Sequence, residues 1–370
     1  MGYSALPDEI IEDIIFRLPP KSVGRCRCVC KLWRAIIRCH CNRIRYLGDE
    51  SLIFTSYRFE SKAFFYSASL KSAHQVFDKI SISATKLSFA HYGSWNRVFG
   101  SCHGLLLVGD YIHEKFVLNP VTGEVGEVPR WPSTFDGWEW PDYCTVYAFG
   151  YDSIGDDYKL VIVDFDGHRY LYAETFTNIF SLKTGTWKSV ESPFYWHANT
   201  TTSPGVFVDG SIHWIACNAS DYKPTIVAFD LAKETFCEVP PPSLAGDMLV
   251  CSRLAAVSGY LCLYHTHDIY DYEVDRPAVK ENIDLWVMKD YGIRESWIRF
   301  TVNSLGASWD FSPLCMLGQD QVVMLKDEEE LIMCDLKEGT FKDIVVHGIP
   351  KKRILPTNFV ESLVSPVWHL

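Results

Sequence analysis

No stretch of this sequence is apolar enough to cross a bilayer, which takes about 20 consecutive apolar residues. Acidic residues stand near the start of the chain, where a secretory signal needs a basic region, so we do not expect secretion. Phosphate-binding loops of the G-x-x-x-x-G-K type and paired C-x-x-C zinc motifs are missing as well. These absences argue against a membrane protein, a P-loop enzyme and a common structural zinc site, and we expect neither a cofactor nor a metal.

Positive charge is scarce relative to negative charge. The 35 Lys and Arg residues against 46 Asp and Glu residues leave a formal net charge of −11. A nucleic-acid backbone would repel such a chain, so we expect no nucleic-acid partner, whereas a basic protein is electrostatically easier to bind. The 13 cysteines, an odd number, argue against a complete disulfide framework and favour a reducing compartment, the cytoplasm or the nucleus.

What the sequence does have is the composition of a large globular protein. Its 370 residues are too many for one small core, and 48% of them are hydrophobic while 22% are charged. Aromatic residues make up 14%, with 12 Trp and 19 Tyr among them, which favours β-structure. A polar, basic connector from Arg38 to Asp49 separates two kinds of pattern. We therefore expect a helical domain at residues 1–45 and a β-domain at residues 46–370.

The first helix is predicted near the N-terminus, in the stretch LPDEIIEDIIFRLPP. Pro7 suits the first turn of a helix, and the acids that follow it suit the positive end of the helix dipole. The apolar residues recur at helical spacing and predict one broad face: Leu6, Ile10, Ile11, Ile14, Ile15 and Leu18. The Pro19-Pro20 pair must end this helix.

Two more short helices are predicted before the connector. One starts near Lys21-Ser22, and its apolar side consists of Val23, Cys26, Val29 and Cys30. The next carries Trp33, Ile36 and Ile37 at helical spacing. Three short helices of this kind hold more apolar surface than they can bury among themselves, so they either cap the domain that follows or dock on a partner.

The sequence of this stretch resembles an F-box. The resemblance rests on the LP at its start, a second LP at Leu18-Pro19, and CVCKLW from Cys28 to Trp33; Cys26 departs from it, because the family often has a large apolar residue there. An F-box implies docking on an adaptor of the Skp family and, through it, on a cullin–RING ubiquitin ligase. We expect the following residues to bind the adaptor: Leu6, Pro7, Ile10, Ile14, Leu18, Pro19, Val29 and Trp33.

Beyond the connector the pattern is one of repeated β-hairpins. An apolar strand, a polar turn and an aromatic or apolar restart recur at 116–123, 179–187, 227–236, 285–297 and 332–341. The copies are roughly fifty residues apart, the period of propeller and kelch-type arrays. A second hairpin precedes most copies, and two hairpins make one four-stranded blade.

We therefore predict an α+β multidomain protein, a three-helix unit followed by an all-β propeller. Five blades are well marked between Gly100 and Pro350, and a sixth must combine strands near Leu52–Phe54 and Ala63–Tyr66 with the C-terminal run Phe359–Val364. Such closure removes exposed sheet edges. Six blades are preferred; seven blades, or a twisted sandwich of the same strands, are the alternatives.

The β-domain also resembles a known family. SCHGLLLV, the LNP turn, FGYDSIGDDYKLV, GVFVDGSIHW, IVAFDLAKETFCEVP and VHGIP look like the F-box-associated, kelch-like domain of plant F-box proteins. That resemblance extends to the S-locus F-box group that acts in self-incompatibility. It implies a domain that captures a target protein.

Catalytic and metal-binding patterns are few. Cys102-His103 sits in a G-x-C-x-G sequence like a nucleophile elbow, but a strand rather than a helix is predicted after it, so we interpret the segment as a turn. The cysteines between Cys26 and Cys41 match no zinc spacing and are interpreted as buried thiols. The acids of GYDSIGDDYK lack the glutamate of a calcium loop and suit a β-turn.

Long connections remain as the predicted recognition surface, because they hold aromatic and acidic residues of the kind found at interfaces. The residues expected to bind the target are Trp131, Phe135, Trp138, Trp140, Tyr143, Tyr195, Trp196, Asp268, Asp271 and Asp275. For each single residue, packing over the propeller rim is the alternative.

The sequence thus favours a non-catalytic receptor subunit of an E3 ubiquitin ligase complex, which holds a target near the charged carrier enzyme. A hydrolase or lyase that uses the propeller pocket and a non-degradative scaffold that binds the adaptor are the alternative functions.

Overall fold

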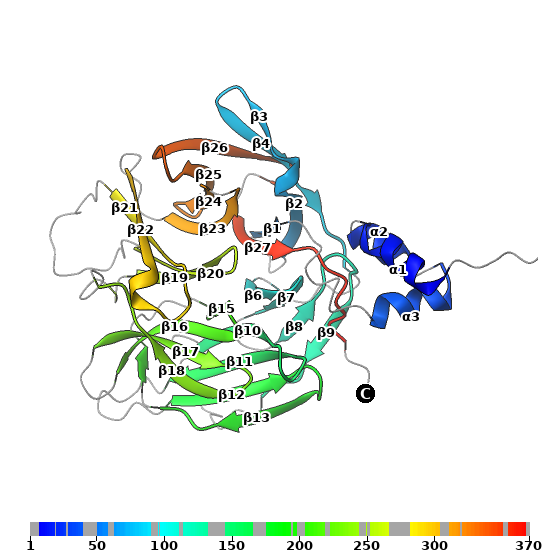
Figure 1. Ribbon diagram of the computed structural model, residues 1–370, viewed down its shortest axis with the longest axis horizontal. Helices are drawn as coiled ribbons and strands as arrows, with labels where there is room; N and C mark the ends of the chain where they lie inside the picture. The colour runs from blue at the N-terminus through cyan, green and yellow to red at the C-terminus, as the bar shows by residue number, and fades with distance from the viewer. Residues whose placement is uncertain are drawn as a thin grey trace, which may run out of the picture.

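The computed structural model describes most of the chain and places three helices beside a ring of β-sheets (Figure 1). The described residues are 7–18, 20–26, 29–39, 50–57, 63–89, 95, 97–110, 114–131, 145–165, 175–193, 195–197, 204–218, 223–243, 249, 252–265, 282–303, 311–318, 320–350 and 354–367. Within this part of the chain, no helix is long and apolar enough to span a membrane.

The helices are α1 (Asp8–Phe16), α2 (Pro20–Cys26) and α3 (Lys31–Cys39). Pro7 is the residue before α1, with an extended backbone (φ −55°, ψ 145°), so its predicted place inside the first turn is wrong. Pro20 opens α2, the position where its missing N–H costs nothing. The buried side chains between the helices are Ile11, Ile15, Val23, Ile36 and Ile37.

The apolar residues of α1 divide between two faces instead of forming one. Ile11 and Ile15 are buried, whereas Ile10 and Ile14 are 46% and 43% exposed. Successive helical residues differ by about 100° around the axis, so Ile10 cannot share the buried side of Ile11 within so small a unit. α2 ends at Cys26, so Val29 and Cys30 lie outside it. The Val29 N–H donates to the Cys26 carbonyl at 3.1 Å and closes a turn there. Their predicted place on α2 is therefore wrong.

Four blades of the propeller follow one antiparallel plan, and their strands run from the innermost to the outermost in chain order. They are β6 (Arg97–Cys102), β7 (Leu105–Gly109), β8 (Lys115–Leu118) and β9 (Val125–Val128); β10 (Thr145–Asp152), β11 (Asp157–Phe165), β12 (Thr175–Ser181) and β13 (Thr186–Val190); β19 (Ser252–Val257), β20 (Tyr260–His265), β21 (Asn282–Met288) and β22 (Trp297–Asn303); and β23 (Phe311–Leu317), β24 (Gln321–Lys326), β25 (Glu330–Asp335) and β26 (Thr340–His347).

A fifth blade has a divided innermost strand. Both β14 (Tyr195–His197) and β15 (Val206–Val208) pair with β16 (Ser211–Asn218), at opposite ends of it. Next to β16 lie β17 (Pro224–Asp230) and β18 (Thr235–Val239). This division was not predicted from the sequence.

The sixth blade joins the two ends of the β-domain and closes the ring. Its innermost strand is β27 (Ile354–Val360), followed by β1 (Glu50–Tyr57), β2 (Ala63–Ser69) and β5 (Thr85–Lys86). β27 pairs with β1 from Glu50 opposite Val360 to Ser56 opposite Ile354. The innermost strands β27, β6, β10, β15, β19 and β23 contact one another in that order around the ring. The described strands thus form six blades, which confirms the preferred prediction.

A second link crosses from the terminal blade to its neighbour. The hairpin of β3 (His74–Val76) and β4 (Lys79–Ser83), which lies between β2 and β5 in sequence, adds to blade β23–β26 through parallel pairing of β4 with β26. In Figure 1 this hairpin extends from the edge of the ring. It gives the blade six strands and was not predicted, because parallel pairing across 260 or so residues leaves no local pattern.

The recurring turn of the third and fourth strands has a common chemistry. At the end of each of β8, β17 and β25 stands a residue whose side-chain oxygen accepts the backbone N–H groups two and three residues further on: Asn119, Asp230 and Asp335. Asx turns of this kind fix the reversal of the chain. They explain why the same polar turn repeats along the sequence.

The two ends of the ring differ in their connections. One end, here called the turn face, carries the tight turns between first and second strands and between third and fourth strands. The opposite end, the loop face, carries the remaining and longer connections. Glu50 opposite Val360 puts the start of β1 on the turn face. The helices pack on this face as well, because Val121 and Leu363 contact their core.

Candidate adaptor and target surfaces

The helices expose a set of apolar side chains that their own core does not use. Ile10, Ile14, Val29 and Leu32 are exposed, and Leu18 and Trp33 are half-buried against the core of the helices. Pro7 is exposed, whereas Leu6 and Pro19 lie outside the described residues. Leu32 was not predicted from the sequence, although it stands beside Trp33 in the CVCKLW stretch. We call Pro7, Ile10, Ile14, Leu18, Val29, Leu32 and Trp33 the adaptor surface.

The residues predicted to bind a target are only partly described. Phe135, Trp138, Trp140, Tyr143, Asp268, Asp271 and Asp275 lie outside the described residues. The strands before and after these residues are described. β9 ends and β10 begins on the loop face, and in the same way β20 ends and β21 begins there. The described strand ends that flank the two segments therefore all lie at the same end of the ring, opposite to the face that carries the helices.

Trp131 has a structural partner. Its ring lies edge-on to that of Trp187, with centroids 5.6 Å apart, and the Trp187 indole N–H donates to the Pro129 carbonyl at 2.7 Å. Since Trp187 belongs to β13, these contacts fasten the connection that leaves blade β6–β9 to the outermost strand of the next blade. Trp131 is therefore an anchor at the base of the predicted recognition segment.

Tyr195 is a correction to the predicted target surface. It is 8% exposed and packs in the core between blades β10–β13 and β14–β18. Its hydroxyl donates to Glu238 at 3.2 Å, and burial together with that carboxylate raises the pKa of Tyr195 to about 12. The strand β14 turns this side chain inward, so it is not available to a partner. The side chain of Trp196, the next residue in β14, is outside the description.

The Cys102-His103 segment is a hairpin turn, as predicted. Cys102 ends β6, Leu105 begins β7, and His103 and Gly104 adopt positive φ angles of 46° and 79° between them. Cys102 is buried, and the His103 ring lies against Tyr151 and Tyr158. A nucleophile elbow needs a helix after the turn. Because a strand follows instead, the geometry that would activate the thiol is missing.

The acids of GYDSIGDDYK also form a turn. One oxygen of Asp152 accepts the backbone N–H groups of Ile154 and Gly155, and the other accepts from the Lys159 ammonium at 2.9 Å. These partners take the place that a cation would need. Among the described residues, no three His, Cys, Asp or Glu side chains lie together in a manner that could hold a metal ion. Cys28, His40 and Cys41 fall outside that description.

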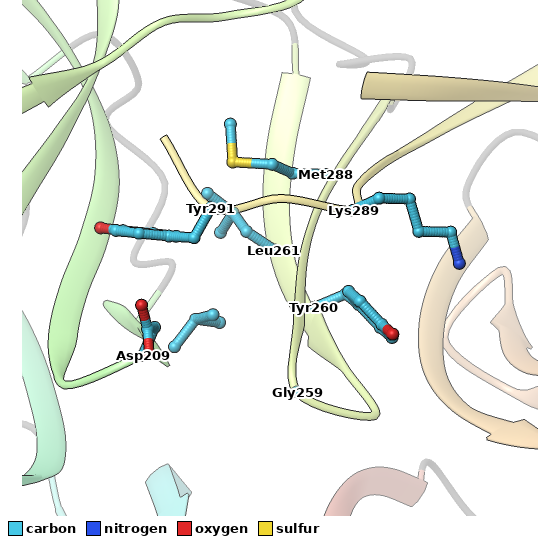
Figure 2. A pocket seen from close by; sticks show the side chains of 8 residues that line it. Asp209, Gly259, Tyr260, Leu261, Met288, Lys289 and Tyr291 are labelled. Atoms are coloured by element: carbon cyan, nitrogen blue, oxygen red, sulfur yellow. The ribbon is translucent and has the colours of Figure 1, made fainter. Parts of the chain in front are cut away.

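A hollow of about 250 Å³ opens on the turn face between blades β14–β18 and β19–β22 (Figure 2). Val208, Leu261 and Met288 form its apolar part, and Asp209, Tyr260, Lys289 and Tyr291 line the rest. Figure 2 shows the Tyr291 hydroxyl directed away from Tyr260 and Lys289. The Lys289 ammonium lies 4.6 Å from the centre of the Tyr260 ring.

Two titratable groups beside this hollow, His213 and Tyr291, hold each other in neutral form. His213 is buried below it, with Nδ1 3.1 Å from the Val206 carbonyl and Nε2 2.6 Å from the Tyr291 hydroxyl. Burial lowers the pKa of His213 to about 4 and raises the pKa of Tyr291 to about 12. Both groups are neutral near pH 7, so Tyr291 donates to His213. The pair joins two blades and offers neither a general base nor an acid poised near neutrality.

Fold and surfaces together define a class: a three-helix module with an exposed apolar set, carried on the turn face of a closed six-bladed propeller. Sequence comparison agrees with it. The F-box domain profile matches residues 4–45, and the profile of the F-box associated beta propeller domain matches residues 51–364. The chain belongs to the F-box proteins that carry an F-box-associated β-propeller domain.

Relatives in Arabidopsis thaliana resemble the chain over nearly its whole length. The F-box protein CPR1 is 28% identical over 94% of this chain and 86% of its own length. An F-box/kelch-repeat protein of the same plant is 27% identical over 98% of this chain and 96% of its own. Among solved structures, TolB from Acinetobacter baumannii is similar with a TM-score of 0.46 and 9% identity, covering 89% of this chain and 73% of that one.

Proposed function

We propose that this chain is the substrate-recognition subunit of a Skp–cullin–F-box ubiquitin ligase. In this role the F-box binds a Skp-family adaptor, and the propeller captures a target protein. Ubiquitin transfer takes place on partner subunits, so the chain contributes proximity rather than chemistry. Membership of the S-locus group stays a prediction.

The observation that carries the proposal is the F-box match at the N-terminus together with its exposed apolar set. Ile10 and Ile14 lie on the side of α1 that turns away from the buried Ile11 and Ile15. Exposed aliphatic residues at helical spacing are anchors for a helical or grooved partner. A Skp-family adaptor is the partner that an F-box implies.

The proposed target surface is the loop face. Of its two flanked segments, 132–144 is rich in Trp and acidic residues, and 266–281 is rich in Tyr and acidic residues. Because the F-box lies on the turn face, a target held on the loop face leaves the adaptor surface free. The acids favour a basic target.

Co-purification of a Skp-family adaptor tests the first half of the proposal. Wild-type chain should retain the adaptor, and the double variant Ile10→Asp with Ile14→Asp should lose it, because charges replace two apolar anchors. The matched control is Ile293→Asp with Ile298→Asp, since these propeller residues are 50% and 43% exposed. That control should bind the adaptor normally. Equal retention by wild type and the α1 variant, both folded, would contradict the proposal.

A further inference from the structure

A segment that follows β27 contacts both domains. After β27, residues 361–367 continue without strand pairing and pass between the propeller and the helices. We call residues 361–367 the tail. Three consecutive residues within it, Ser362, Leu363 and Val364, are buried, although no strand holds them.

The propeller holds the tail through its backbone and through alternate side chains. The wholly buried Asn119 directs its amide nitrogen to two tail carbonyls, those of Ser362 at 3.1 Å and Val364 at 2.7 Å. The Val364 side chain lies in the core with Leu105 and Tyr158. Ser362 packs so tightly on Gly104 that a Cβ there would lie 2.2 Å from its hydroxyl oxygen.

The residue between these two serves the F-box instead. Leu363 is 1% exposed and lies in the cluster formed by Ile11, Ile15, Val23, Ile36 and Ile37. Successive tail side chains thus alternate between the two domains: Ser362 and Val364 contact the propeller, and Leu363 contacts the helices. Val121, in the turn that Asn119 caps, contacts the same cluster.

We propose that the tail, through Leu363, fixes the orientation of the F-box on the propeller, and this inference rests on the proposed ligase function. The chain joins the two domains covalently at the start of β1, and a single covalent link leaves rotation free. Leu363 and Val121 add a second attachment, so the F-box cannot turn without exposing apolar surface that is now buried. An adaptor bound to the F-box would then have one fixed orientation relative to the loop face.

This arrangement makes one segment responsible for two tasks. Residues 354–360 close the ring as β27, and the tail that follows positions the F-box. Leu363 is thus a positioning residue for ubiquitin transfer: it contacts neither adaptor nor target, but it sets the distance and angle between them.

The test measures the distance between the domains directly, in the full chain bound to a Skp-family adaptor. Spin labels on non-canonical amino acids at Asp13 in α1 and Lys183 in blade β10–β13 avoid the 13 native cysteines. Both positions are exposed. Electron–electron resonance should give a narrow distance distribution for wild type. Leu363→Ser should widen it at least twofold while the adaptor stays bound.

Two controls and a second variant complete the design. Leu363→Met keeps the apolar volume and should restore the narrow distribution, and Val367→Ser, at the exposed end of the tail, should leave it unchanged. Should Leu363→Ser fail to fold, Val121→Ser, which removes a half-buried side chain from the same contact, must widen the distribution. An unchanged width in the folded Leu363 or Val121 variant overturns the inference. Failure of wild type to bind the adaptor instead overturns the proposed function, and the distances in the free chain then still test the tail.

Discussion

Asn119 and Val364 are 245 residues apart in the chain, yet the side-chain amide of Asn119 donates to the Val364 carbonyl at 2.7 Å. The same side chain accepts the Val121 N–H at 2.8 Å through its oxygen. One residue therefore caps a local turn and holds the tail. Asp230 and Asp335 perform only the first of these tasks in their own blades.

Asn119→Asp should therefore be far from conservative. The aspartate keeps the turn cap but loses the donor to two buried carbonyls, which costs roughly 1–3 kcal/mol of unfolding free energy or more, since a charge now faces them. Protonation would restore a donor, so the loss should shrink as the pH falls towards 4. Urea unfolding at several pH values checks both statements. The matched control is Asp230→Asn, which keeps its cap and should leave the urea midpoint nearly unchanged. Equal effects of the two substitutions would show that the contact with the tail adds nothing to the free energy of unfolding.

Gly104→Ala should destabilise the protein more than Gly210→Ala. Both glycines follow a positive-φ residue in the turn between the first two strands of a blade, with φ of 79° and 75°. Their backbone strain on substitution is therefore similar, about 1 kcal/mol or more each. A Cβ at Gly104 would also lie 2.5 Å from the Ser362 Cβ and 2.7 Å from the Val360 carbonyl oxygen, whereas nothing lies within 4 Å of one at Gly210. The difference in melting temperature between the two variants measures the effect of the contact with the tail. Equal melting temperatures would mean that the tail moves away from the new Cβ without loss of stability.

Lys159→Met should destabilise the junction of blades β10–β13 and β14–β18. The buried ammonium of Lys159 donates to Asp152 at 2.9 Å, to Glu234 at 3.0 Å and to the Leu231 carbonyl at 2.6 Å. Removal of one partner from a buried ion pair costs about 3–5 kcal/mol, because the remaining charges are uncompensated. Lys233→Met, which removes an exposed partner of Asp230, is the control and should be near neutral.

Lys159→Met should also change the pH dependence of stability. Burial opposes ionisation of Asp152 and Glu234, but hydrogen bonds from Gly155, Lys159 and Lys188 outweigh it and lower the pKa of both carboxyls. Their stabilisation is therefore present above the unfolded-state pKa values of about 4 and is lost as the pH falls through the lowered values. Wild type should therefore lose its advantage over Lys159→Met progressively as the pH falls below about 4. Melting curves from pH 7 to about pH 2 test this, and a gap that stays constant over that range would contradict it.

Trp138→Ala with Trp140→Ala should abolish target capture and leave adaptor binding and melting temperature unchanged. Tryptophans at the centre of an interface can each cost about 2 kcal/mol on truncation. Neutralising Asp268, Asp271, Glu273 and Asp275 should instead slow association and weaken its dependence on salt. Neutralising the turn-face acids Asp290 and Glu338 is the control and should have little effect. Normal binding by the tryptophan variant, with salt-independent association, would move recognition away from the loop face.

Local patterns predicted most of the fold. The F-box motif, the polar turns and the hairpins at fifty-residue spacing depend on residues close together in the sequence, which is why they could be predicted. The need to remove exposed sheet edges predicted the closure of the ring by the termini. The division of α1 into buried Ile11 and exposed Ile10 could not be predicted, because an apolar face that wide fits either assignment. Tyr195 was predicted in the target surface because the residues around it have the composition of a long connection. Its burial depends on pairing with β16, and the role of Leu363 depends on two domains meeting, which no local pattern records.

Reconstituted ubiquitin transfer tests the central claim most directly. Proteins captured by the wild-type chain would be presented to it again with a Skp-family adaptor, a cullin–RING pair, carrier enzyme and ubiquitin. Wild type should direct ubiquitin chains onto a captured protein. The folded Ile10→Asp with Ile14→Asp variant should capture the same protein without modifying it. Transfer that is equally fast with both chains, or absent with wild type although adaptor and target are both bound, would contradict the assignment as a ligase receptor.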